Sequence, residues 1–304
     1  MADLVLRLGT RQSPLALAQS RWVAREIESR HAGVGVELVP IITRGDREKG
    51  DLGAIGGKGL FTEELEQGLL DGSMDLAVHS LKDLPVTLPE GLAVVAYPER
   101  ADPRDGLICE VAEDLDGLPE GAVLLTGSQR RQAQLLHQRS DLRIEPVRGN
   151  VGTRLRKWRD SGHAGAILAV AGIHRLGLDD VPLHPLDPER IVPAPGQGIL
   201  AVEVRLGGRA EPYARSLDHP PSAQAAAAER RIVTALGGDC TLPLAAWARP
   251  NGNGLRLTAV LAAPDGQRVS RGEGQGASAE DAAEACLEAL RRDGSESLLA
   301  TLRP

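Results

Sequence analysis

The chain has 304 residues, of which 42% are hydrophobic and 25% are charged, and its formal net charge is −7. A chain of this length is too long to fold around a single hydrophobic core, so two or three globular domains are expected. The negative charge argues against a nucleic-acid partner, because nucleic-acid binders present a basic face. The sequence also contains no run of about 18 apolar residues, the length that is needed to span a membrane.

The first predicted elements are a strand, a cationic turn and a helix. The strand starts near Val5 and ends at Arg11, after which Ser13 can cap a helix whose first turn contains Pro14 and whose apolar positions recur to Ile27. The start of the chain lacks the apolar run and cleavage pattern of a signal peptide. Three cysteines form an odd and sparse set, as in a reducing compartment, so we expect a cytoplasmic protein.

A glycine-rich segment follows at residues 43–59, with charges of both signs. Such a segment packs poorly, and we predict a mobile lid. Its GGKG run resembles a phosphate loop, but Gly59 stands where that motif needs Ser or Thr, so we reject this interpretation. The single Phe of the chain, Phe61, comes next; a functional role and a simple helix anchor are equally open.

Strand and helix signals alternate as far as Leu217, which is the α/β pattern. Five of the strands run directly into a cationic turn or helix start. Because ligands of open α/β sheets bind at the carboxyl ends of the strands, beside helix N-termini, this layout predicts a site for a small polyanion. The cations at these ends are Arg11, Lys82, Arg130, Arg131, Arg148, Arg154, Arg156 and Arg175.

Two turn-rich links, at residues 97–106 and 181–198, divide the α/β part. Two crossings are what a bilobed protein with a hinged cleft requires. After His219 the composition changes to a strong helix, short strands and an amphipathic helix near residues 278–292. We predict an α/β domain 1 from 1–98 with 198–217, an α/β domain 2 from 104–193, and a small α+β domain 3 from 220–304.

Two residues could carry chemistry. Cys240 lies on a glycine-rich turn where a thiol is accessible, whereas Cys109 and Cys286 have the surroundings of core residues. Asp83 lies just past a strand end beside Lys82, and taken alone this dipeptide is better explained as an ion pair. No histidine pairs with another His or Cys at ligand spacing, so we expect no metal.

Ten motifs occur in order between Leu6 and Pro243: TRQSPLALAQ, ITRGD, GGKGLF, AVHSLKDLP, DPRD, SQRRQAQL, RGNVGTRL, AVAGIHRLG, PGQG and GGDCTLP. Together they resemble the hydroxymethylbilane synthase family, also called porphobilinogen deaminases. The resemblance implies two periplasmic-binding-protein-like α/β domains that form a cleft, with a small α+β domain at the C-terminal end. It also implies the condensation of four porphobilinogen molecules into a linear hydroxymethylbilane, with release of ammonia at each step. Growth starts on a covalent dipyrromethane cofactor.

The resemblance also implies roles for individual residues. Cys240 matches the cysteine that carries the cofactor through a thioether, and Asp83 matches the catalytic carboxylate, with Lys82 and Arg11 beside it. Matches to cofactor-binding positions are Ser13, Lys82, Asp83, Thr126, Ser128, Arg130, Arg131, Arg148, Gly149 and Asn150. Matches to substrate-binding positions are Arg11, Phe61, Arg148, Arg154, Arg175 and Gln197.

The chain departs from the family pattern at Leu125, Gly127, Gln129, His174 and Asp239. The first three stand in the turn before the Arg130 pair, and one hydroxyl contact to the cofactor is expected to be absent there. His174 replaces a common Lys, and Asp239 replaces a frequent Gly beside the cysteine. None of these changes removes a residue that the chemistry requires.

Two other classes of protein share this kind of fold. A non-catalytic anion-binding protein would have no use for Asp83 and Cys240, and a transcriptional effector domain would need a helix-turn-helix segment that the sequence lacks. We therefore expect an enzyme that acts on porphobilinogen as a monomer, with no metal, nucleic acid or membrane partner.

Overall fold

The computed structural model describes residues 3–47, 62–237 and 242–302. The chain separates into two compact units, residues 1–100 with 199–223 and residues 101–198 with 224–304. The three-domain division drawn from the sequence, and the cleft between the α/β domains, stay predictions.

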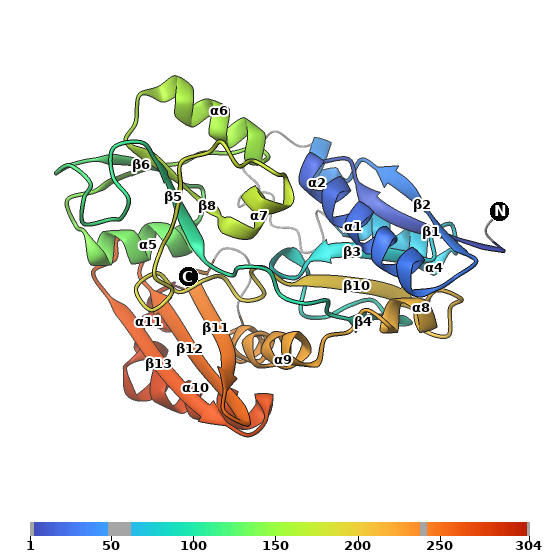
Figure 1. Ribbon diagram of the computed structural model, residues 1–304. Helices are drawn as coiled ribbons and strands as arrows, with labels where there is room; N and C mark the ends of the chain where they lie inside the picture. The colour runs from blue at the N-terminus through green and yellow to red at the C-terminus, as the bar shows by residue number, and fades with distance from the viewer. Residues whose placement is uncertain (1–2, 48–61, 238–241, 303–304) are drawn as a thin grey trace. The chain divides into compact units, whose positions relative to one another are not determined.

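The first unit is built on a five-stranded sheet in the order β2-β1-β3-β10-β4 (Figure 1). Strands β1, β2 and β3 are parallel, whereas β10 runs antiparallel to both β3 and β4. The strands are β1 (Leu4–Arg11), β2 (Val34–Ile41), β3 (Leu76–Ser80), β4 (Leu92–Ala96) and β10 (Leu200–Arg205). The helices are α1 (Pro14–Arg30), α2 (Arg44–Arg47), α4 (Glu63–Leu70), the short 3-10 helix η1 (Leu81–Asp83) and α8 (Glu211–Arg215).

Helix α1 confirms the first predicted element. Ser13 adopts an extended conformation at the N-cap and its Oγ accepts a hydrogen bond from Ala16 N, while Pro14 occupies the first turn. The helix buries Val23, Ala24 and Ile27 against the apolar residues of β1, β3 and β10. This packing fixes the start of α1 at the carboxyl end of β1.

The second unit repeats the arrangement with a sheet in the order β7-β6-β8-β5-β9. Strands β6, β7 and β8 are parallel, and β5 runs antiparallel to β8 and β9. The strands are β5 (Asp105–Cys109), β6 (Val123–Leu125), β7 (Arg143–Glu145), β8 (Gly165–Ala169) and β9 (Leu183–Pro185). The helices are α5 (Gln129–Gln138), α6 (Val151–Ser161) and α7 (Val170–Arg175).

The last part of the chain forms a three-stranded antiparallel sheet in the order β11-β12-β13. Helix α9 (Pro220–Ala235) precedes it; the strands are β11 (Leu244–Asn251), β12 (Gly254–Ala262) and β13 (Val269–Gly276), and helices α10 (Ala279–Arg292) and α11 (Ser295–Leu302) follow. The predicted amphipathic helix is α10, and Ser278 and Asp281 form a capping box at its start. The mixed α/β fold with a small C-terminal sheet agrees with the predicted fold class.

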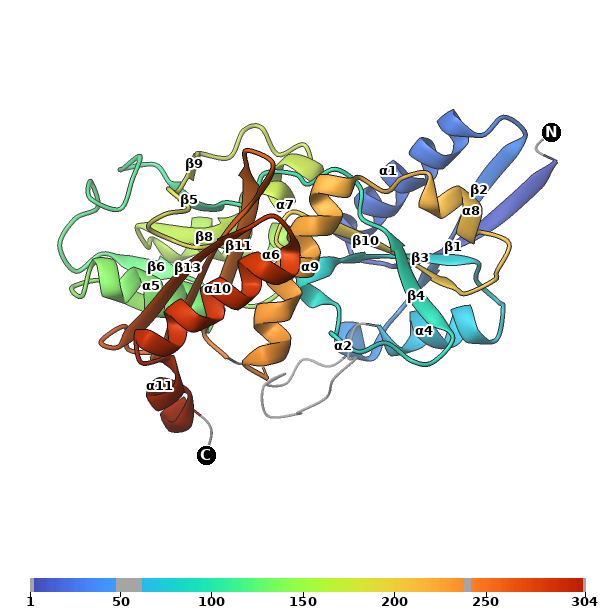
Figure 2. The same cartoon turned by 90° about the horizontal axis from the view of Figure 1, so that it is seen from below.

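Three glycines of β13 let helix α10 lie directly on the sheet (Figure 2). Gly272, Gly274 and Gly276 alternate along the strand and therefore share one face. A Cβ atom at Gly274 would lie 2.3 Å from Ala282 O and from Cys286 N. Any side chain at these positions would push the helix away from the strand.

Candidate active site

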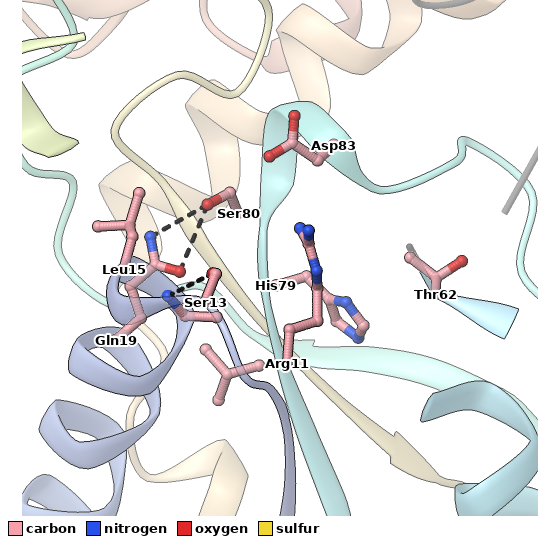
Figure 3. A pocket seen from close by; sticks show the side chains of 10 residues that line it. Arg11, Ser13, Leu15, Gln19, Thr62, His79, Ser80 and Asp83 are labelled. Atoms are coloured by element: carbon pink, nitrogen blue, oxygen red, sulfur yellow. Dashed lines mark hydrogen bonds between the residues drawn. The ribbon is translucent and has the colours of Figure 1, made fainter. Parts of the chain in front are cut away.

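A pocket in the first unit collects three of the predicted residues (Figure 3). Arg11 ends β1, Ser13 caps α1, and Asp83 ends η1, directly after β3. Because β1 and β3 are parallel neighbours, their carboxyl ends lie at the same edge of the sheet. The residues that line the pocket are Arg11, Ser13, Leu15, Ala16, Gln19, Thr62, Val78, His79, Ser80 and Asp83.

The pocket contains polar side chains that sequence reasoning missed. Gln19 Nε2 donates a hydrogen bond of 3.0 Å to Ser80 Oγ, which links helix α1 to the end of β3. His79 and Ser80 begin the HSLKD run that ends at Asp83, and this closeness in the sequence was the available signal. Lys82 lies in the same 3-10 turn but is not among the described residues that line the pocket.

The second unit brings together Arg130, Arg131 and Gln197 around Asp105. The Asp105 carboxylate has no exposed surface, and the two arginines are 6% and 5% exposed. Arg130 Nη1 donates to Asp105 Oδ2 at 2.7 Å, Arg131 Nε donates to Oδ1 at 3.0 Å, and Gln197 Nε2 donates to Oδ1 at 2.8 Å. The sequence analysis overlooked Asp105 as a site residue, although it is the last residue of the DPRD motif.

Further hydrogen bonds join the two arginine side chains to backbone carbonyl groups. Arg130 Nη1 also donates to Val192 O at 2.7 Å, and Arg131 Nη1 donates to Ile167 O at 2.8 Å. Burial alone would raise the pKa of Asp105, but Arg130 and Arg131 outweigh it and hold that pKa far below its usual range. Burial lowers the pKa of Arg130, and the Asp105 carboxylate opposes this shift.

We expect Asp105→Asn to lower the free energy of unfolding by about 3–5 kcal/mol, because it leaves two buried guanidinium groups without their counter-charge. Since the folded-state pKa of Asp105 is depressed, its contribution is present above the unfolded-state pKa, near 4, and is lost as the pH falls. Urea unfolding measured at pH 7 and at progressively lower pH checks both points. The wild type should lose more stability on acidification than the variant.

Asp102→Asn is the matched control for Asp105→Asn. Asp102 pairs with Arg104 at 2.6 Å, but the two side chains are 21% and 40% exposed. A pair of this kind contributes only about 0–1 kcal/mol. Equal losses for the two variants would contradict the role of Asp105 as a buried counter-charge.

The remaining predicted residues of the second unit lie where strands of its sheet end. Thr126 follows β6, and its Oγ1 accepts a hydrogen bond from Ser128 N; Ser128 caps α5. Asn150 caps α6 through its side chain, which accepts from Thr153 N at 2.8 Å. Arg154 Nε donates to Gly149 O at 2.7 Å, so it stays close to Arg148. The departure at Gly127 has a steric reason, because a Cβ there would lie 2.7 Å from Val147 O.

Arg175 is a partly buried cation at the end of α7. Its Nη2 donates to Gly198 O at 2.7 Å, which is its one bond in the described part of the chain. Burial lowers the pKa of Arg175 to about 10. A guanidinium that is desolvated without a carboxylate beside it is well suited to receive an anion.

Cys240 and Phe61, the departure at Asp239 and most of the predicted lid lie outside the described residues. Both described cysteines, Cys109 and Cys286, are buried, as expected. Burial raises the pKa of the Cys286 thiol to about 12, so this thiol stays protonated.

The described ranges lack both a metal-ion cluster and a membrane-spanning helix. Residues 3–47, 62–237 and 242–302 contain no cluster of three or more His, Cys, Asp or Glu that could hold a metal ion. Among the same residues, every helix is too short or too polar to cross a bilayer.

The fold and the pocket together define an α/β protein whose strand ends bring cations, a serine and a carboxylate together. Residues 6–210 match the porphobilinogen deaminase dipyrromethane cofactor-binding domain, and residues 223–292 match the porphobilinogen deaminase C-terminal domain. The chain belongs to the porphobilinogen deaminase family. Its function is therefore hydroxymethylbilane synthesis, its cofactor is dipyrromethane, and the resemblance noted in the sequence is confirmed.

Three solved structures are similar to this chain at low sequence identity. The methionine-binding protein MetQ is 13% identical, with a TM-score of 0.44, and the match covers 70% of this chain and 89% of MetQ. The BenM effector-binding domain, solved with benzoate, is 14% identical, with a TM-score of 0.43, and the match covers 78% and 95% of the two chains. A methionine-binding lipoprotein of Bacillus subtilis, described as putative, is 10% identical, with a TM-score of 0.41 and coverage of 69% and 87%.

Proposed function

We propose that the protein is a transferase that joins four porphobilinogen molecules at the pocket of Arg11, Ser13 and Asp83. The observation that carries this proposal is that Arg11 and Ser13, at the turn from β1 to α1, meet Asp83 from the end of η1 in one pocket. Both segments lie within residues 6–210, which match the cofactor-binding domain of the family. We further propose that the protein acts as a monomer in the cytoplasm.

Asp83 is the proposed catalytic group. Its carboxylate stabilises the positive charge that develops beside the pyrrole nitrogen, and its oxygens relay the proton that the pyrrole loses. Arg11 lines the same pocket and binds a substrate carboxylate through its guanidinium fork. Lys82 adds a further positive charge in the neighbouring turn, and Ser13 adds a hydroxyl group.

The second unit holds the proposed groups for the cofactor and the growing chain. Each pyrrole ring carries an acetate and a propionate, so every addition brings two more carboxylates. Arg175 lacks a carboxylate partner among the described residues, so its guanidinium group is suited to bind one of these added carboxylates. Other proposed contacts come from the strand ends and helix starts of this unit: Thr126, Ser128, Arg130, Arg131, Arg148, Gly149, Asn150, Arg154 and Gln197.

Cys240 is the proposed attachment point of the cofactor through a thioether, and Phe61 is the proposed ring-stacking residue. When bound, dipyrromethane supplies the pyrrole carbon to which the first substrate ring is joined. The protein's own contribution is to neutralise the carboxylates of the pyrrole rings, to hold the substrate ring in the reactive orientation and to move the proton at Asp83.

A colour reaction and a mass measurement test this function. We expect the purified protein to turn pink-red with the acidic aldehyde reagent for pyrroles, and to exceed the mass of its 304-residue chain by one dipyrromethane. It should also consume porphobilinogen and release one ammonia for each molecule consumed. An anion-binding protein would give no colour, no added mass and no ammonia, and that result would overturn the proposal.

A further inference from the structure

Three ionisable side chains are buried between the sheet of the first unit and helix α4. They are Glu66 on α4, His79 on β3 and Glu203 on β10, with exposed fractions of 8%, 6% and 0%. Leu65, Leu69, Met74, Ala77 and Leu92 form the apolar cluster in the same layer. Charged groups are costly in such surroundings unless they are paired, so their presence calls for an explanation.

Glu203 and His79 form a direct pair. Strands β3 and β10 are antiparallel, with His79 opposite Ala201 and Glu203 opposite Ala77, so both side chains project from one face of the sheet as diagonal neighbours. His79 Nε2 lies 2.8 Å from Glu203 Oε2. Glu203 Oε1 has no hydrogen-bond partner among the described residues, and the imidazole is therefore the group that balances this carboxylate.

Glu66 limits the negative charge in this layer. Burial raises the pKa of Glu66, and repulsion from Glu203 raises it further, while the neighbouring Thr62 and His79 side chains act in the opposite direction. The raised pKa favours the neutral acid at Glu66. The direct partner of His79 in this layer is then the carboxyl group of Glu203.

His79 also reaches the pocket that contains Asp83. It lines this pocket together with Arg11 and Ser13, and Figure 3 shows its ring beyond the Arg11 side chain, on the side of Thr62. The titratable groups around the imidazole are thus Glu203 from β10, Glu66 from α4, and Arg11 and Asp83 from the pocket. Glu203 and Glu66 do not line the pocket themselves.

We propose that His79 is a second cation of the Asp83 pocket for a porphobilinogen carboxylate, and that Glu203 is the positioning residue that holds its ring and supplies its counter-charge. The proposal rests on the proposed function of this pocket. Arg11 then takes one carboxylate of the incoming pyrrole and His79 takes the other. Glu203 acts only through His79, since its carboxylate is fully buried behind the ring.

Steady-state kinetics of three cofactor-loaded variants test this inference: His79→Gln, Glu203→Gln and the double variant. We expect each single variant to raise KM for porphobilinogen roughly tenfold to hundredfold, the value of one charge-assisted contact, with kcat within about threefold of the wild type. The double variant should be no worse than His79→Gln by more than about twofold, because Glu203 has no effect once the imidazole is gone. We expect Glu203→Asp, which keeps the carboxylate, to have a KM between those of Glu203→Gln and the wild type.

Glu66→Gln is the matched control, since it changes a buried carboxyl of the same layer that does not line the pocket. Its KM should stay within about twofold of the wild type. If Glu203→Gln does not fold, His79→Gln decides alone, and an unchanged KM overturns the proposal. The proposal is also overturned if the increases in KM of the two single variants multiply in the double variant, or if the single variants lower kcat at constant KM. If the wild type consumes no porphobilinogen, the proposed function is overturned too. If the wild type is active and the KM of Glu203→Gln is unchanged, only the role of Glu203 is overturned.

Discussion

Cys240→Ala is expected to yield a folded protein that carries no dipyrromethane and makes no hydroxymethylbilane. The proposed thioether needs a sulfur that is accessible and able to ionise. Cys109 and Cys286 are both fully buried, and the pKa of Cys286 is raised to about 12, so neither can replace it. Intact mass, the colour reaction for pyrroles and turnover should all be lost together, while circular dichroism should be unchanged.

The matched controls for Cys240→Ala are the same substitutions at Cys109 and Cys286. Both should keep the covalent adduct, although removal of a buried side chain will cost some stability. Peptide mapping that finds dipyrromethane on either of these cysteines would refute the assignment. So would full turnover of Cys240→Ala.

Asp83→Asn is expected to lower kcat by at least about 10²–10⁴-fold, the usual contribution of a placed side chain that transfers a proton. The substitution keeps the size and hydrogen-bonding capacity of the side chain but removes its charge and basicity. Binding of porphobilinogen should change less, because the carboxylates of the substrate are held by cations rather than by Asp83. A variant that cannot build its own cofactor should be supplied with preformed tetrapyrrole before the assay.

Asp71→Asn is a suitable control for Asp83→Asn. Asp71 is also exposed in the first unit, where its Oδ1 accepts a hydrogen bond from Ser73 N, and it does not line the pocket. Its kcat should match that of the wild type. If loaded Asp83→Asn turns over within a few-fold of the wild type, Asp83 is only an ion-pair partner.

The local part of the fold could be predicted from the sequence. The first helix was readable because its cap, its proline and its apolar positions all lie within one short segment. The cationic strand ends were readable because the cations stand at the strand ends or in the turns and helices that come next in the chain. Strand β11 was not predicted, since Trp247, Arg249 and Pro250 interrupt its apolar pattern.

The buried polar groups could not be predicted. Glu203 stands between apolar residues in β10, a pattern that normally places a glutamate on the solvent side of a strand. Its partner His79 is 124 positions away, so only the folded sheet reveals the pair. Asp105 likewise meets Arg130 and Arg131 only when β5 and α5 come together.

The glycines of β13 have a consequence for local unfolding. Glycine in a strand interior costs about 0.5–1 kcal/mol relative to alanine, because it loses more backbone freedom on folding. Gly272, Gly274 and Gly276 therefore give this strand little intrinsic tendency to stay extended, and the docked helix α10 must supply the difference. When α10 detaches, β13 loses its support, so the strand and the helix open as one cooperative unit and their amide protons exchange with solvent in the same event.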